Sequence, residues 1–127
     1  MPSFLSPLLH ADAERLVLRN QRTGTVVASR LLPAFDSASR RTGLLKHTSL
    51  SADTALIIAP TNAVHTLFMR FAIDVAFVTK EGRILKIADH LQPWRMAAKW
   101  GGYAVVEMTA GAFARCGTAL SDTLVIE

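Results

Sequence analysis

The chain has 127 residues, of which 50% are hydrophobic and 19% are charged, and its formal net charge is +4. This composition excludes a disordered protein, and the length suffices for one hydrophobic core. The longest uncharged stretch, residues 54–69, contains Pro60, Asn62 and His65, so the sequence predicts no transmembrane helix. The single cysteine, Cys116, excludes an internal disulfide.

The first residues of the chain show no pattern of regular structure. Residues 1–13 include Pro2 and Pro7 and have no hydrophobic period, so we expect a loose N-terminal tail. Because no basic leader precedes an apolar run, the sequence predicts no signal peptide, and the cytoplasm is the expected compartment. Residues 14–127 are expected to form a single β-rich domain.

The first half of that domain shows strand patterns around one helical segment. Asp36 or Ser37 can act as the N-cap of this helix. The continuous apolar run Ala-Leu-Ile-Ile-Ala is typical of a strand that is buried on both faces. The expected elements are a hairpin of strands over 15–19 and 25–32, a helix over 37–46 and a strand over 55–59.

Residues 64–78 are the most apolar part of the chain, yet they contain His65, Arg70 and Asp74. As one helix, the stretch would place Arg70 and Asp74 four residues apart on the same face. As two strands with a break before Asp74, it would alternate its side chains between two faces. Its many Val, Ile, Phe and Thr residues favour the two strands.

The second half of the chain adds further strands and one long connection. Residues 80–82, Lys-Glu-Gly, indicate a hairpin, and the connection over residues 91–102 contains Trp94 and Trp100. The expected strands lie over 64–69, 74–79, 83–88, 103–109 and 120–126. These patterns predict a mainly β fold, an antiparallel sandwich or distorted barrel of about seven or eight short strands with one or two short helices. An open α+β sheet is the alternative.

Short motifs follow one another along the chain in a specific order. They are Arg41 with Gly43-Leu44-Leu45, Pro60, His65-Thr66-x-x-Met69, Ile73-Asp74-Val75-x-Phe77, Gly82, Pro93-Trp94 and Val106-Glu107-x-x-Ala110-Gly111. This series resembles the bacterial and archaeal family called domain of unknown function 192, over residues 31–127. The resemblance implies a compact β-rich domain without an established activity, whose members often look exported. The chain has Ser121-Asp122 where the family has Gly-Asp, and it has Thr61 near a position where relatives often have Cys.

Four polar residues in apolar surroundings are candidates for chemistry or for internal pairing. His65 is either a base, ligand or pH-sensitive group, or a buried ring that donates to a backbone carbonyl. Asp74 needs hydrogen-bond donors or a cation if it is buried. Arg41 is its expected ion-pair partner, with Arg70 as the competitor. Glu107 is either a charge that guards a sheet edge or a member of the same site as His65.

The sequence predicts no metal site and no cofactor. His65, Met69 and Cys116 are soft donors, but their spacing matches no compact ligand pattern. No phosphate-binding loop or dinucleotide fingerprint is present, and no motif of a catalytic cysteine surrounds Cys116.

Three functions are compatible with these residues. The favoured one is a non-catalytic binding or accessory module for a small ligand or a protein segment, with a cleft near His65, Thr66, Asp74, Glu107 and Trp94. The second is an enzyme, of hydrolytic or other type, that uses His65 with Asp74 or Glu107. The third is a nucleic-acid accessory protein, because residues 15–46 contain seven basic residues and one acid. No nucleic-acid motif accompanies these charges, so a solvated basic face is favoured over that third function.

Overall fold

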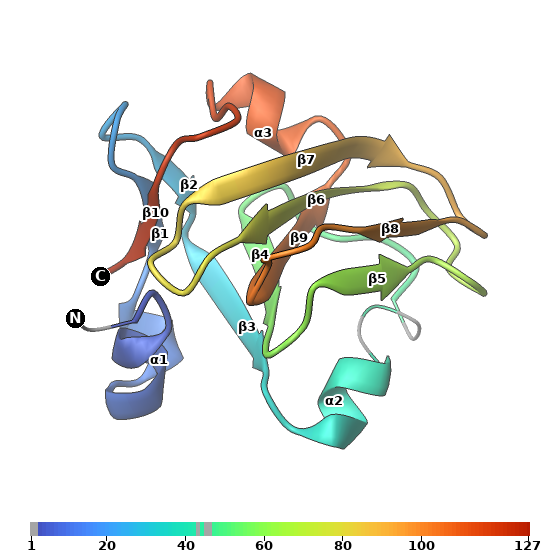
Figure 1. Ribbon diagram of the computed structural model, residues 1–127, viewed down its shortest axis with the longest axis horizontal. Coiled ribbons are helices and arrows are strands. Elements are labelled where there is room, and N and C mark those ends of the chain that lie inside the picture. Colours follow the sequence, from blue (N-terminus) through green and yellow to red (C-terminus); the bar gives the residue numbers. More distant parts are fainter. Residues whose placement is uncertain (1–2, 43, 45–46) are drawn as a thin grey trace.

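A computed structural model describes residues 3–42, 44 and 47–127, without the side chains of residues 41 and 42. These residues form ten strands, three short α-helices and one 3-10 turn (Figure 1). The strands are β1 (Leu18–Asn20), β2 (Val26–Ala28), β3 (Arg30–Ala34), β4 (Thr54–Ile58), β5 (Ala63–His65), β6 (Ile73–Val78), β7 (Ile84–Leu91), β8 (Met96–Ala98), β9 (Ala104–Thr109) and β10 (Leu124–Ile126). The helices are α1 (Ser6–His10), α2 (Ser37–Thr42) and α3 (Ala112–Arg115), and the 3-10 turn is Ala13–Arg15.

The predicted mainly β class is confirmed, with more strands than expected. The segment predicted as one strand over residues 25–32 is divided into β2 and the start of β3. The connection predicted over residues 91–102 contains the three-residue strand β8. Strands of this length leave little hydrophobic pattern in a sequence, because alternation needs at least four residues to be recognised.

Five strands form the main sheet, in the order β3-β4-β9-β6-β7. Neighbouring strands are antiparallel, except that β3 and β4 are parallel, which departs from the expected antiparallel sheet. The chain returns from the end of β3 to the start of β4 through α2 and the residues after it, as a parallel pair requires. The central strands β4, β9 and β6 are buried on both faces, which explains the continuous apolar run of β4 and the mostly apolar sequences of β6 and β9.

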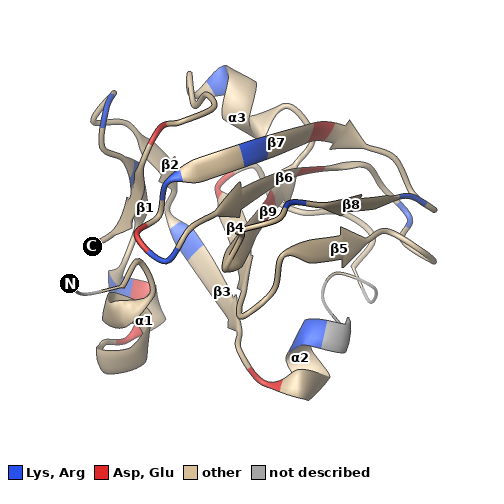
Figure 2. Cartoon of the chain, in the orientation of Figure 1, with Lys and Arg blue, Asp and Glu red and all other residues tan. Residues whose placement is uncertain are grey.

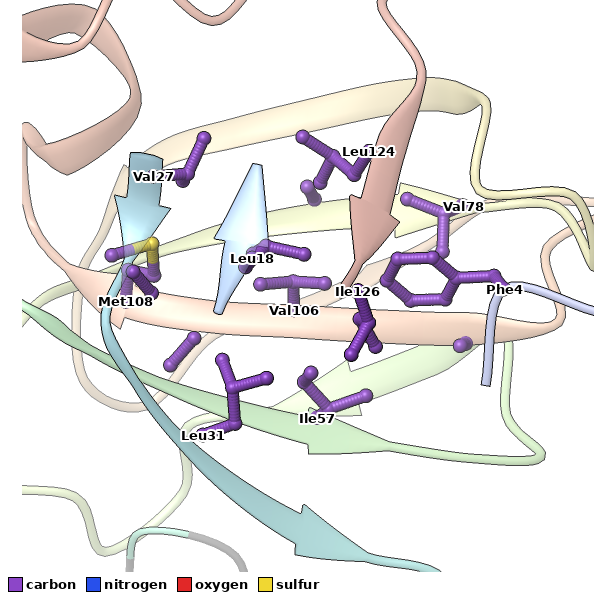
Figure 3. Packing of buried hydrophobic residues seen from close by; sticks show 14 of the residues in the cluster. Phe4, Leu18, Val27, Leu31, Ile57, Val78, Val106, Met108, Leu124 and Ile126 are labelled. Atoms are coloured by element: carbon purple, nitrogen blue, oxygen red, sulfur yellow. The ribbon is translucent and has the colours of Figure 1, made fainter. Parts of the chain in front are cut away.

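One face of the main sheet packs against a second, three-stranded sheet with the order β10-β1-β2. Leu31, Ile57 and Val106 of the main sheet lie in one hydrophobic cluster with Leu18 and Ile126 of the small sheet (Figure 3). The small sheet joins the first and last strands, since β1 pairs with β10. The two sheets therefore enclose the larger hydrophobic core.

The opposite face of the main sheet carries a second hydrophobic cluster, which includes Val75 and Phe77. Leu44 and Leu50, from the residues between α2 and β4, cover part of this face. Strands β5 and β8 form a two-stranded antiparallel sheet, called the ribbon below, and Val64 of the ribbon belongs to the same cluster. The ribbon therefore has one face on the second core and one face toward solvent.

The N-terminal residues from Ser3 onward pack against the protein and do not form the expected loose tail. The backbone N–H of Phe4 donates to the carbonyl oxygen of Lys80 at 2.6 Å, and the side chains of Phe4 and Leu5 are buried. Gly82 has a φ of +90°, and a Cβ there would collide with the Leu124 backbone and lie 2.9 Å from the Phe4 ring. Phe4 and Leu5 are therefore part of the larger hydrophobic core.

Two local predictions are confirmed. Asp36 caps α2, since its carboxylate accepts a hydrogen bond from the Ser39 backbone N–H at 2.7 Å. This bond and the Ser39 hydroxyl lower the pKa of Asp36. The central apolar stretch forms the two strands β5 and β6 and not one helix, with an irregular turn over residues 66–72 between them.

Candidate functional site

Asp74 lies in β6 and is completely buried. Its Oδ1 accepts hydrogen bonds from the backbone N–H groups of His90 at 2.9 Å and Gly111 at 3.0 Å. Its Oδ2 accepts a third bond from the backbone N–H of Phe113 at 3.2 Å. Three backbone donors supply what a buried carboxylate needs, and they fix the end of β7 and the start of α3 to β6. The expected ion pair with Arg41 involves a side chain outside the described residues.

Glu107 lies in the central strand β9 and points to the other face of the sheet. Asp74 shares a face with Ala76, which belongs to the larger core, whereas Glu107 shares a face with Val105 of the second cluster. Glu107 is buried, with 5% of its surface exposed. Burial raises the pKa of Glu107 to about 7. Glu107 is therefore a core carboxyl group and not a guard of a sheet edge.

His65 is exposed at the end of β5, on the solvent face of the ribbon, where it is opposite Met96 of β8. Asp74 and Glu107 are both buried, on opposite faces of the main sheet. The three residues therefore point in three directions, and their described positions form no acid–base group. Among the described residues, no three His, Cys, Asp or Glu side chains are arranged to hold a metal ion.

Thr66 lies next to His65 and connects two loops at the end of the ribbon. Its buried hydroxyl donates to the Gln92 carbonyl oxygen at 2.6 Å and accepts from the Arg95 backbone N–H at 2.8 Å. Its backbone N–H donates to the Arg95 carbonyl at 2.8 Å, and its own carbonyl accepts from the Trp94 N–H at 2.9 Å. Two motifs that are distant in the sequence, His65-Thr66-x-x-Met69 and Pro93-Trp94, are thereby brought together.

Phe68 and Trp94 extend from these two loops into solvent. Their ring centroids are 4.6 Å apart at an interplanar angle of 58°, and the side chains are 69% and 56% exposed. Both residues have a φ of 66°, in the left-handed region that bulky side chains rarely adopt. Such a conformation costs roughly 1–3 kcal/mol per residue, and it persists only where the surroundings enforce it. Here the hydrogen bonds of Thr66 hold both loops.

Met96, two residues after Trp94, is 75% exposed on the solvent face of the ribbon. We call Phe68, Trp94 and Met96 the apolar tip. Exposed large apolar side chains that gather at one place often indicate a binding surface, whereas isolated ones are ordinary. Trp100 is 91% exposed at the other end of β8 and lies outside the tip.

The two chain segments that carry the apolar tip contain basic residues and no acid. Residues 62–72 and 92–102 contain Arg70, Arg95 and Lys99, all exposed, and no Asp or Glu. Basic positions occupy the connections at both ends of β8 (Figure 2). The nearest acid after residues 62–72 is Asp74, which is buried. The nearest acid before residues 92–102 is Asp89 of β7, which is exposed.

Three of the early basic residues make bonds within the protein. Arg19 pairs with Glu127 at 2.7 Å, and Arg22 pairs with Asp122 at 2.6 Å. Arg40 donates to the backbone carbonyl of Phe35 at 2.6 Å. Internal bonds therefore engage several of the charges that suggested a nucleic-acid surface.

A hollow lies on the described surface beside the early part of the chain. Its volume is about 620 Å³, and it is open to solvent. It lies beside the 3-10 turn and β3 and is lined by Asp12, Ala13, Glu14, Ser29, Arg30, Leu31, Leu32 and Asp53. His65, Thr66, Asp74, Glu107 and Trp94 contribute nothing to it.

Of the residues predicted for the cleft, Trp94 belongs to the apolar tip and His65 and Thr66 lie at the end of β5 next to it, whereas Asp74 and Glu107 are buried in the main sheet. Sequence reasoning missed Phe68, because strand alternation placed that residue on a regular strand face, whereas the strand ends at His65. Arg95 and Met96 follow Trp94 directly in the same connection and were not among the residues predicted for the cleft. The only signal for these residues was their position next to a tryptophan and a proline in a long connection.

Among the described residues, no helix combines the length and the apolar character needed to cross a membrane. The fold is similar to that of two solved bacterial structures. A protein of unknown function from Novosphingobium aromaticivorans DSM 12444 aligns with a TM-score of 0.74 and 24% identity, over 86% of this chain and 81% of that one. A proposed transcription regulator from Sinorhizobium meliloti 1021 aligns with a TM-score of 0.73 and 18% identity, over 86% and 89% of the two chains.

At these identities the two structures show the fold alone, and no curated protein matches the sequence. The family model described as uncharacterized ACR, the domain of unknown function 192, matches residues 18–126. This match confirms the resemblance expected from the motifs, and the chain belongs to that family.

Proposed function

We propose that this protein is a binding module whose contact surface is the apolar tip with its basic neighbours. The observation that carries the proposal is the pair of exposed rings on left-handed backbone, Phe68 and Trp94. Neither ring is buried in a core, so the cost of these backbone conformations is not offset by burial within the chain. A surface that is held in one shape before contact loses less conformational entropy when it binds.

Binding is favoured over acid–base catalysis by the positions of the candidate groups. His65 is the only one of the three that reaches solvent, whereas Asp74 and Glu107 are buried on opposite faces of the sheet. Asp74 already accepts three backbone hydrogen bonds and has a structural role. His65 is placed to contribute to recognition beside the apolar tip. The proposed partner is a small ligand or a segment of another macromolecule.

The experiment uses variants that remove the rings without disturbing the backbone. Asn accepts left-handed φ values better than aromatic residues do, so Phe68→Asn and Trp94→Asn are expected to stay folded. Ligands are selected from a library of random displayed peptides and from a fragment library, with the wild-type protein as bait. The two indole N–H signals in NMR spectra then report which tryptophan each ligand contacts.

The proposal expects selected ligands to shift the Trp94 signal and to leave the Trp100 signal in place. Affinity should fall about thirtyfold in each Asn variant, since truncating an aromatic anchor costs about 2 kcal/mol. Ligands that shift Trp100 alone, or that bind the Asn variants as well as the wild type, would remove the apolar tip as the contact surface.

A further inference from the structure

The apolar tip and its charges together restrict the kind of partner that fits. Phe68, Trp94 and Met96 are each more than half exposed, so they protrude and do not line an enclosed pocket. Small-molecule sites are usually concave and bury most of their ligand. The partner is therefore expected to present an extended apolar region into which side chains can insert.

The same partner should carry negative charge. Arg70 and Arg95 are exposed on the two loops that carry the tip, Lys99 is exposed at the far end of β8, and residues 62–72 and 92–102 contain no acid. A bilayer with anionic headgroups combines an apolar interior with a negative surface, and Trp and Phe are suited to the level between the two. The pattern of exposed apolar side chains with Lys and Arg beside them is typical of proteins that lie on such a surface.

The geometry of the rings argues against single-stranded nucleic acid as the partner. Bases stack on exposed ring faces, and the contact between Phe68 and Trp94, with centroids 4.6 Å apart at an interplanar angle of 58°, reduces the ring surface that is open to a base. Met96 has no ring on which a base could stack.

Building on the proposed binding function, we propose that the apolar tip docks on an anionic lipid surface. Phe68, Trp94 and Met96 enter the headgroup region, and Arg70 and Arg95 contact the lipid phosphates. Thr66 supports this contact by fixing both loops in advance, through its bonds to Gln92 and Arg95.

The test uses the two tryptophans as separate reporters. Trp100→Phe leaves Trp94 as the only tryptophan, and Trp94→Phe leaves Trp100. Each variant is mixed with phosphatidylcholine vesicles, with and without phosphatidylserine, and is followed by cosedimentation and tryptophan emission. With phosphatidylserine present, the Trp94 emission is expected to move to shorter wavelength, and the Trp100 emission is expected to stay unchanged.

A positive protein binds acidic vesicles to some extent wherever its charges lie, so a matched charge control is needed. Arg70→Gln and Arg95→Gln are each expected to lower the partition coefficient about fivefold, which corresponds to about 1 kcal/mol per basic residue at an anionic surface. Arg83→Gln, in an exposed position just before β7, removes the same charge away from the tip and should have a smaller effect. Equal effects of all three variants would overturn the proposed docking site.

Failure of the lipid proposal can be separated from failure of the binding function. The absence of cosedimentation, equal binding to neutral vesicles, or an emission shift of Trp100 instead of Trp94 would each overturn the lipid proposal. If the Trp94 indole signal then responds to a selected peptide, a fragment or an oligothymidine, the binding function stands with a different partner. If Trp94 responds to none of these probes, both proposals are wrong.

Discussion

Arg22 and Asp122 form an ion pair at the end of the small sheet, with 2.6 Å between Arg22 Nε and Asp122 Oδ1. Asn20 and the backbone N–H of Ala119 donate to the same carboxylate at 2.9 Å and 2.8 Å. The pair and these two bonds lower the pKa of Asp122. The Asp122 carboxylate thus joins the β1–β2 turn to the residues that precede β10.

This lowered pKa predicts how stability depends on pH in the acid range. The contribution of ionised Asp122 is fully present above the pKa of an unfolded aspartate, about 3.9. It is lost as the pH falls toward the lower pKa of the folded state. Urea unfolding of Asp122→Asn should therefore show a flatter decline below about pH 4 than the wild type. Parallel declines for the two proteins would contradict this prediction.

The loss of stability caused by a substitution of Asp74 should increase with the number of N–H donors that the substitution leaves without an acceptor. Asp74→Ala leaves three N–H groups without this acceptor, of which the one of Phe113 is buried and those of His90 and Gly111 are part-buried. A buried N–H group without an acceptor costs about 1–3 kcal/mol. Asn can keep the oxygen that accepts from His90 and Gly111, so Asp74→Asn should lose only the bond from Phe113. Chemical denaturation of both variants measures the difference, and equal costs would contradict the three-donor arrangement.

The expected ion pair between Arg41 and Asp74 can be tested in the same experiments. A double-mutant cycle of Arg41→Ala and Asp74→Asn should show a coupling energy above about 0.5 kcal/mol if the two side chains interact. If the losses of stability in the two single variants add up in the double variant, Arg41 and Asp74 do not interact, and the partners of Asp74 are the backbone N–H groups.

Glu107 should make the protein less stable as the pH rises toward neutrality. Its ordinary pKa is 4.5 and its folded pKa is about 7, so the unfolded chain releases this proton first. Stability therefore falls between these two pH values, by at most about 3 kcal/mol from this group. Glu107→Gln should remove this decline and should be more stable than the wild type at about pH 8. A difference between the two proteins that stays constant from pH 5 to pH 8 would oppose this prediction.

Removal of the Thr66 hydroxyl should loosen the two loops of the apolar tip. Thr66→Val keeps the shape but leaves the Arg95 N–H and the Gln92 carbonyl without their partner, at a cost of about 1–3 kcal/mol. Thr66→Ser keeps the hydroxyl and serves as the control. Near-ultraviolet circular dichroism should show a weaker tryptophan signal for Thr66→Val than for Thr66→Ser. Identical spectra of the two variants would mean that the Thr66 hydroxyl does not fix the ring of Trp94.

Ser121 offers a stabilising substitution. It is exposed and has a φ of 72°, in the left-handed region. Gly adopts this conformation without steric cost, so Ser121→Gly should raise the free energy of unfolding by up to about 1 kcal/mol. Ser121→Ala keeps a Cβ and should not raise the free energy of unfolding. Thermal unfolding of Ser121→Gly and Ser121→Ala therefore separates the relief of backbone strain from the loss of the hydroxyl group.

The sequence predicted elements that have strong local patterns and missed contacts that depend on distant backbone. The apolar run of β4 and the cap Asp36 are local features, and both predictions hold. The partners of Asp74 include N–H groups 16, 37 and 39 residues away, and every residue type except proline offers such a donor. The same limit applies to Phe68, because its exposure follows from a left-handed turn that no glycine or asparagine indicates.

The pairing of β1 with β10 has a consequence for how the protein is made. Leu18 is aligned with Ile126, and the β1 backbone beyond it bonds to residues of the same late segment. While the chain emerges from the ribosome, β1 can pair with β2, but its other edge stays open until residues 124–126 are available. Strand edges that wait in this way are prone to pair with other chains. Slow synthesis of the second half of the protein should therefore favour aggregation, and a chaperone that covers residues 18–20 should reduce it.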